Sequence, residues 1–281
     1  MFAPTFMENA FLAGSFIALA GGLTGYFLVL RAQVFAGDAL SHVAFTGGLA
    51  AVAFTVDVRV GLFAATILAA IAMGALGEHA RADDVVIGSF FAWILGLGVL
   101  FLSIFTTNQS ATNATAGVRV LFGSIFGLST SDAQLAAVIA GAVGVITLLI
   151  ARPLLFTTLD LDVARAKGVP IRLLGIGFLA LFATEAAEAT QAVGALLLLA
   201  LVAAPAGAAQ LLTSRPYRGL ALSAAIALAS MWAGLALAYE VPSLPPSFAI
   251  TTIASTGFAI ALAIRHRERV QRRPSAVVVS P

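Results

Sequence analysis

Apolar runs long enough to cross a lipid bilayer recur along the whole chain. The hydrocarbon core of a bilayer is about 30 Å thick, and a helix of about 20 residues crosses it. Because backbone N–H and C=O groups in lipid must be satisfied within the segment, we predict that each run is a helix. The predicted helices lie at residues 10–30, 35–54, 60–77, 85–106, 134–151, 171–188, 193–213, 219–239 and 247–265. The sequence therefore predicts an all-α, polytopic transmembrane helical bundle with about eight or nine transmembrane helices.

The segment around residues 107–133 differs from the rest. It contains the polar stretch TTNQSATNATAG and then VRVLFGSIFGL, which is apolar but too short to span. We predict a short re-entrant or interfacial helix here. A composition of 60% hydrophobic and 10% charged residues excludes an ordinary soluble domain. We therefore expect one transmembrane domain at residues 1–265 and a basic cytoplasmic tail at residues 266–281.

The basic residues predict the orientation of the chain. With these helices, all Lys and Arg residues except Arg59 and Arg119 fall on one side of the membrane. An excess of Lys and Arg marks the cytoplasmic side, so we expect the tail RHRERVQRR in the cytoplasm and the N-terminus outside. The cations are dispersed over loops and tail, which indicates topology and not nucleic-acid binding. The opposite side carries acids instead: Glu8, Asp57, Asp132, Glu188 and Glu240. An acidic outer surface favours a cation that approaches from outside. The equal alternative is that these are ordinary solvated acids of loops.

An acid and an imidazole interrupt the second apolar run, in the stretch FAGDALSHVAFTGG at residues 35–48. An Asp at the centre of a membrane helix costs about 2.5–3.5 kcal/mol, and such residues usually face a pathway or a partner. Asp38 and His42 are four residues apart, so both lie on one helix face. With a helix starting near Gln33, His42 lies roughly 14 Å inward, close to the midplane.

This donor pair suits a transition metal. A carboxylate and an imidazole favour zinc, manganese or iron(II) over calcium or magnesium, which take mostly oxygen ligands. Two ligands are too few for tetrahedral coordination, and a symmetric dimer that meets at this face would supply two Asp and two His. The alternative is a structural hydrogen bond between Asp38 and His42 that only holds helices together.

Two further acids, Glu185 and Glu188, lie within the sixth apolar run. They are three residues apart and share a helix face near its outer end. They are candidates for an outer access route for cations. The alternative is a helix end that reaches the lipid headgroups.

The stretch GDALSHVAF at residues 37–45 resembles the signature of the integral membrane permeases of bacterial zinc and manganese ABC importers, the ABC-3 family. Three further stretches resemble that family in order and spacing: DLDVARAKGVP at 160–170, VGALLLLALVAAPAGAAQLL at 193–212 and VPSLPPSFAI at 241–250. The resemblance implies that Asp38 and His42 bind the transported metal. It also implies a homodimer in the bacterial cytoplasmic membrane, cytoplasmic ATP-binding subunits and an extracytoplasmic metal-binding protein.

The stretch DLDVARAKGVP is charged and lies between two predicted spans. A short helix starting near Asp160 or Asp162 would be capped by an Asp and stopped by Gly168 and Pro170. On the residues alone, a solvated loop is the alternative. The resemblance implies instead a segment that couples the protein to the ATPase, with Asp160, Asp162, Ala164, Arg165 and Gly168 in that role.

The sequence contains no GxxxxGK[ST] phosphate-binding loop and no HExxH or GxSxG motif. We therefore expect a transport subunit that is not itself an enzyme, with ATP hydrolysis supplied by a separate chain. No permanently bound cofactor is expected, only the transported divalent metal, zinc or manganese. The alternatives are an ATP-independent secondary cation transporter or channel, and a membrane scaffold with a structural Asp–His pair.

Overall fold

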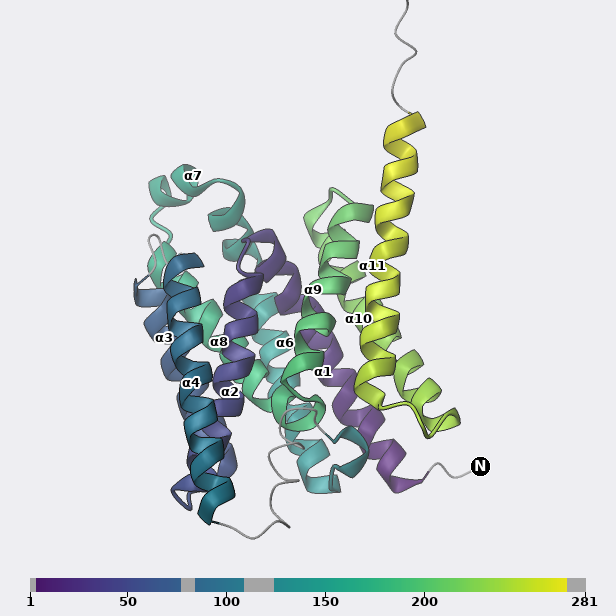
Figure 1. Cartoon of the computed structure of the whole chain (residues 1–281). Coiled ribbons are helices and arrows are strands. Elements are labelled where there is room, and N and C mark those ends of the chain that lie inside the picture. The colour runs from purple at the N-terminus through teal and green to yellow at the C-terminus, as the bar shows by residue number, and fades with distance from the viewer. Residues whose placement is uncertain (1–3, 77–83, 109–123, 272–281) are drawn as a thin grey trace, which may run out of the picture.

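The computed structural model of this chain describes residues 4–76, 84–108 and 124–271, and that part is entirely helical (Figure 1). No strand occurs among these residues. The elements are α1 (Thr5–Leu30), α2 (Val34–Ala53), α3 (Val58–Leu76), α4 (Asp84–Asn108), the 3-10 turn η3 (Ile125–Gly127), α6 (Thr130–Leu159), α7 (Leu161–Ala166), α8 (Ile171–Val193), α9 (Ala195–Leu212), α10 (Pro216–Glu240) and α11 (Pro246–Gln271).

Seven of the described helices are long and apolar enough to cross a membrane: α1, α3, α4, α6, α8, α10 and α11. The two other long helices fall outside this set. The apolar stretch of α9, Leu197–Leu212, is shorter, and α2 carries Asp38 and His42 among many Gly and Ala residues. The predicted all-α membrane bundle is confirmed, whereas the number of eight or nine crossing helices and the homodimer stay predictions.

Several helices extend beyond the apolar runs that predicted them. Helix α6 begins before residue 134 because the Ser129 side chain caps it, accepting a hydrogen bond from the backbone N–H of Asp132 at 3.2 Å. Helix α11 continues past residue 265 to Gln271, so the predicted basic tail starts as helix. An apolar run marks only the lipid-facing length of a helix, while caps and breakers decide where the helix ends.

The re-entrant or interfacial helix predicted around residues 107–133 lies largely outside the described residues. The described part of this region contains the end of α4, the short turn η3 and the start of α6. Residues 272–281 of the predicted tail also lie outside the described residues.

Helix α1 lies at the centre of the bundle and packs against α6, α9 and α10 (Figure 1). Small residues permit this close contact. Any side chain at Gly22 would meet the backbone of Ala224 in α10, and any side chain at Gly25 would meet the backbone of Val202 in α9. The Ser223 hydroxyl also donates a hydrogen bond to the Gly22 carbonyl at 2.6 Å. The small-residue run GGLTG at residues 21–25 therefore serves packing.

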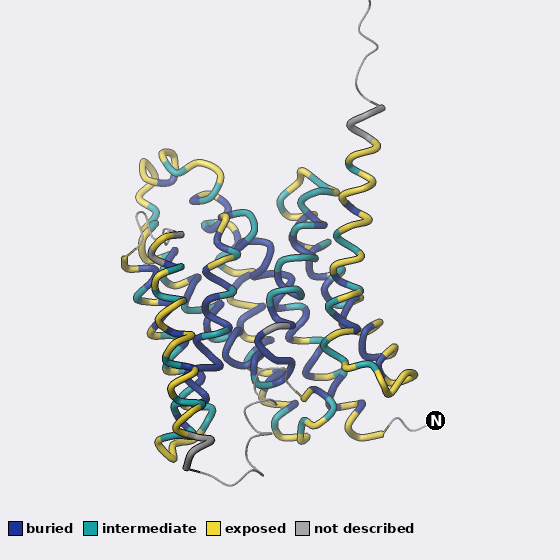
Figure 2. The backbone as a smooth tube through the Cα atoms, viewed as in Figure 1, coloured by how far each residue is buried: buried dark blue, intermediate teal, exposed yellow. Residues whose placement is uncertain are grey.

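The outer helices expose apolar side chains, as a lipid-facing surface requires. Figure 2 shows buried residues concentrated in the inner helices and exposed ones along α4 and α11. Helix α4 packs mainly against α2 and exposes Val85, Trp93 and Val99. At one end of the bundle lie α7 and the C-terminal end of α11, and the start of α1 lies at the other (Figure 1).

The contact between α2 and α3 provides a test of this packing. A methyl group on Gly47 would meet the Gly61 carbonyl and the Ala65 side chain, whereas Gly96 of α4 has open space around it. We predict that Gly47→Ala lowers the free energy of unfolding by about 1–3 kcal/mol through overpacking. The matched change Gly96→Ala should be neutral or stabilise by up to about 1 kcal/mol. Thermal unfolding of the detergent-solubilised protein measures both, and equal effects would contradict the close α2–α3 contact.

Candidate functional site

The middle of helix α2 is buried apart from two side chains. Between Ala36 and Leu49, every residue is buried except Asp38 and His42. The two side chains are 23% and 17% exposed, respectively. The structure therefore brings the predicted acid and imidazole to the same face, where a ligand can reach both.

The distance between the two groups favours a shared ion over a direct bond. His42 Nε2 lies 3.8 Å from Asp38 Oδ1, which is beyond hydrogen-bonding distance. Two ligand atoms bound tetrahedrally to one ion at about 2.1 Å each lie about 3.4 Å apart. A small rotation of either side chain would close the difference, so this pair can hold an ion between an oxygen and a nitrogen.

Helix α4 supports the pair from one side. The His42 ring meets the Phe91 ring edge to face, with centroids 5.2 Å apart, and Phe35 meets the same ring at 5.9 Å. The Thr46 hydroxyl donates to the Ile94 carbonyl at 3.3 Å and ties α2 to α4. Sequence reasoning missed Phe91, because nothing in its own apolar run indicates which neighbouring helix it faces.

The described chain brings few metal-ligating side chains together. Within residues 4–76, 84–108 and 124–271, no group of three or more His, Cys, Asp or Glu side chains is placed to hold a metal. Asp38 and His42 thus contribute two donors, fewer than the four that a tetrahedral zinc site uses.

Glu185 and Glu188 lie inside the bundle, 1% and 2% exposed. The Thr24 hydroxyl oxygen of α1 lies within hydrogen-bonding distance of Glu185 Oε2, at 2.7 Å, and the Arg59 guanidinium lies 3.6 Å from Glu188 Oε1. This burial excludes the alternative in which both acids reach the lipid headgroups. Their part in an outer access route for cations stays a prediction.

Arg59 of α3 connects α6 and α8 at the end of the bundle where α1 begins. Its guanidinium lies 3.3 Å from Asp132 of α6 and 3.6 Å from Glu188 of α8. Its Nε donates to the Gln191 side chain of α8 at 3.1 Å. Two of the acids expected to make this side negative are therefore paired with a cation from α3. The sequence alone left Arg59 as an isolated loop cation, because its partners come from distant segments.

The segment predicted to couple to an ATPase forms a short capped helix. Asp160 caps α7 by accepting a hydrogen bond from the backbone N–H of Val163 at 3.0 Å. Gly168 follows the helix with a φ of 71°, a conformation that favours glycine. Within the helix only Ala164 is buried. The exposed Asp162 and Arg165 side chains form a loose pair at 3.9 Å. The predicted helix with its Asp cap and Gly stop is confirmed, while its coupling role stays a prediction.

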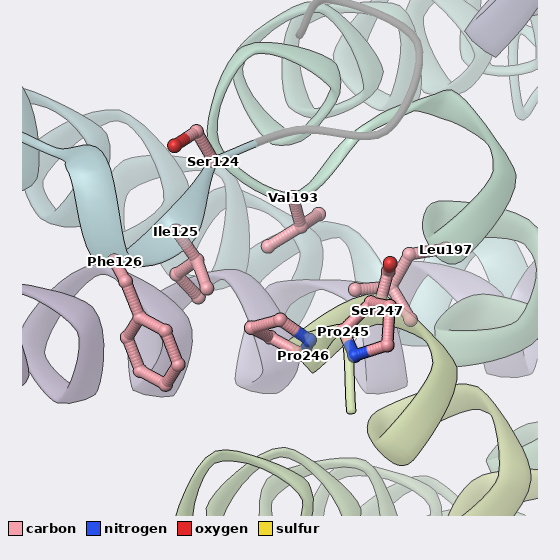
Figure 3. Close-up of a pocket in the computed structure, with 8 residues that line it drawn as sticks. All are labelled: Ser124, Ile125, Phe126, Val193, Leu197, Pro245, Pro246 and Ser247. Carbon is pink, nitrogen blue, oxygen red and sulfur yellow. The ribbon is translucent and has the colours of Figure 1, made fainter. Parts of the chain in front are cut away.

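A cavity of about 250 Å³ lies between segments that meet at one end of the bundle (Figure 3). Its lining comes from η3, the junction of α8 and α9, and the turn into α11. Two hydroxyl groups and no titratable side chain line it, and α2 contributes none of the lining residues: Ser124, Ile125, Phe126, Val193, Leu197, Pro245, Pro246 and Ser247. The described lining therefore offers no carboxylate, imidazole or thiolate ligand for a transition metal.

Comparison with known proteins gives a consistent result. The sequence profile described as the ABC 3 transport family matches residues 3–265. The manganese transport system membrane protein MntC of Halalkalibacterium halodurans is 28% identical over 272 residues, which cover 96% of this chain and 90% of that protein. The chelated iron transport system membrane protein YfeD of Yersinia pestis is 26% identical, over 98% of this chain and 91% of that protein.

Solved structures share the fold. A chain of the structure described as PsaBC from Streptococcus pneumoniae in complex with Fab superposes with a TM-score of 0.81. It is 22% identical in sequence, and the match covers 95% of both chains. At this level of identity the likeness establishes the fold alone.

The Arg59 cluster predicts a large loss of stability when its cation is removed. Arg59→Gln leaves the buried Glu188 carboxylate without its cation, so the free energy of unfolding should fall by about 3 kcal/mol, the lower end of the range for breaking a buried ion pair. The matched control is Arg218→Gln, because Arg218 is exposed. Thermal unfolding in the same detergent measures both, and an Arg59 variant as stable as the control would contradict the cluster.

Proposed function

The chain belongs to the ABC 3 transport family, and on that premise we propose that it is the transmembrane permease subunit of an ATP-driven importer for a divalent transition metal, zinc or manganese. The observation that carries the proposal is the pair of accessible donor groups on α2. An otherwise buried helix leaves only an acid and an imidazole accessible between Ala36 and Leu49. These are the donor types that transition metals prefer.

The site is completed by a second copy of the chain. Each protomer offers one oxygen and one nitrogen donor, and two protomers related by a two-fold axis would offer four ligands. A homodimer that meets along this face of α2 would place the ion on the axis, between two Asp38 and two His42 side chains. The metal is a passing substrate, so no ion is bound permanently.

The relatives' names bear on the choice of metal. Two relatives that are similar over nearly the whole chain are named for manganese and for chelated iron. Four ligands of mixed oxygen and nitrogen type also suit zinc. Manganese is therefore the first metal to test, with zinc and iron(II) beside it.

The energy comes from cytoplasmic ATP-binding subunits that dock on α7. Helix α7 protrudes at the end of the bundle where the C-terminal end of α11 also lies (Figure 1). The basic residues predict that this end is cytoplasmic. An extracytoplasmic metal-binding protein delivers the ion on the other side. The subunit itself is no enzyme and works in the bacterial cytoplasmic membrane as a multi-pass protein with a cytoplasmic C-terminus.

Substitution of the two ligands tests the transport site. Asp38→Ala and His42→Ala should each lower metal uptake by about 100-fold, because each change removes half of the donors in a protomer. The controls are Glu240→Ala and His266→Ala, which change an exposed acid and an exposed imidazole elsewhere. Uptake of radioactive manganese or zinc is measured in proteoliposomes that contain the permease, its ATP-binding subunit and ATP.

Two outcomes of that experiment would overturn the proposal. Wild-type uptake without the ATP-binding subunit would identify a secondary transporter or channel instead. Unchanged uptake by both ligand variants would leave Asp38 and His42 as a structural pair in a membrane scaffold.

Substitution in α7 tests the coupling to ATP. Ala164 is fully buried at the base of α7, so Ala164→Glu should displace the short helix. We predict that metal-stimulated ATP hydrolysis by the reconstituted complex falls by about 10-fold, while the metal affinity of the permease is unchanged. Arg267→Gln, an exposed change at the same end of the bundle, is the control. A variant that keeps normal stimulated hydrolysis would contradict the role of α7.

A further inference from the structure

Glu185 and Thr24 connect α8 to α1 deep inside the bundle. Thr24 is fully buried and Glu185 is 1% exposed. The Thr24 oxygen lies 2.7 Å from Glu185 Oε2 and 2.9 Å from the backbone carbonyl oxygen of Ala20. Both distances are those of good hydrogen bonds between oxygen atoms.

The two short contacts of the Thr24 oxygen need two protons. The Thr24 hydroxyl supplies one proton, and an ionised Glu185 supplies none. A threonine hydroxyl carries a single proton and donates a single hydrogen bond. The carbonyl oxygen of Ala20 can only accept, and so can an ionised carboxylate. Both short contacts are satisfied together only if the Thr24 hydroxyl donates to Ala20 and accepts from a protonated Glu185.

The surroundings of Glu185 disfavour a negative charge. No described Lys, Arg or His side chain forms an ion pair with Glu185, and its Oε1 atom is buried without a hydrogen-bond partner. A methyl group on Gly21 of α1 would meet Glu185 Oε1 together with the aliphatic side chains of Leu201 and Val202 in α9, so all four residues surround the same space. The other acid on this face, Glu188, is paired with Arg59. An unpaired carboxylate in such a place carries a large desolvation penalty, which a neutral acid avoids.

We infer that Glu185 is a proton-binding site within the bundle, whose carboxyl group holds a proton on Oε2 and donates it to the Thr24 hydroxyl. The hydroxyl in turn donates to the Ala20 carbonyl, so a chain of two hydrogen bonds connects α8 to α1. One carboxyl group and one hydroxyl among aliphatic side chains offer too few donors for a metal ion. The ligand of this site is therefore the proton alone. This inference does not depend on the transport function.

Infrared spectroscopy of the purified full-length protein in lipid nanodiscs tests the inference directly. A protonated carboxylic acid has a carbonyl stretching band that is separate from the bands of carboxylates and amides. At neutral pH, the wild type should show such a band, and Glu185→Gln should lose it. The matched control is Glu188→Gln, which should keep the band because Glu188 is paired with Arg59.

A second pair of variants keeps Glu185 and changes its partner, so the inference can still be tested if Glu185→Gln fails to fold. Thr24→Val removes the hydroxyl partner and should shift the band, whereas Thr24→Ser keeps a hydroxyl and should leave the band unshifted. The inference is overturned if the wild-type spectrum lacks the band. It is also overturned if Glu185→Gln retains the band, or if Thr24→Val leaves it unshifted.

Discussion

The low dielectric of the membrane interior requires that each polar group find a partner within the protein, and the acids of this bundle meet that requirement in three ways. Glu188 is paired with the Arg59 guanidinium. Glu185, with only a hydroxyl beside it, is best satisfied as a neutral acid. Asp38 keeps about a quarter of its side chain accessible and has an imidazole one turn away. Of these three acids, only Asp38 is accessible from outside the chain, which is why it is the acid best suited to a ligand that binds and leaves.

The same requirement explains why the helices approach one another so closely. Apolar side chains gain little from leaving lipid for a protein interior, so association depends on close van der Waals contact and hydrogen bonds between helices. Gly22 lets the Ser223 hydroxyl of α10 reach its carbonyl oxygen. Gly47 and Gly61 let the backbones of α2 and α3 touch. These close contacts hold α2 in an orientation that leaves Asp38 and His42 accessible.

The sequence predicted the long helices and the short helix α7 well because their signals are local. Apolar length identifies a spanning helix, and the Asp160 cap and the Gly168 stop define α7. Contacts between distant segments carry no such signal. The pairing of Arg59 with Glu188 and the support of His42 by Phe91 depend on how α3, α8, α2 and α4 are placed in space. Spacing could place Asp38 and His42 on one face, but only packing decides that this face stays open.

The described helix contacts connect α7 to Asp38 and His42, and the proposed coupling to ATP would act along this route. Helix α8 begins at Ile171, shortly after α7, and packs against α2. A methyl group on Gly37 would lie 3.3 Å from the Phe182 ring of α8, so this ring lies next to the residue that precedes Asp38. Toward its other end, Glu188 and Gln191 of α8 both contact Arg59 of α3, which also pairs with Asp132 of α6. Because closely packed elements shift as units, a displacement of α7 would tilt α8 about its anchored end. The Phe182 ring would carry that displacement directly to α2 at Asp38.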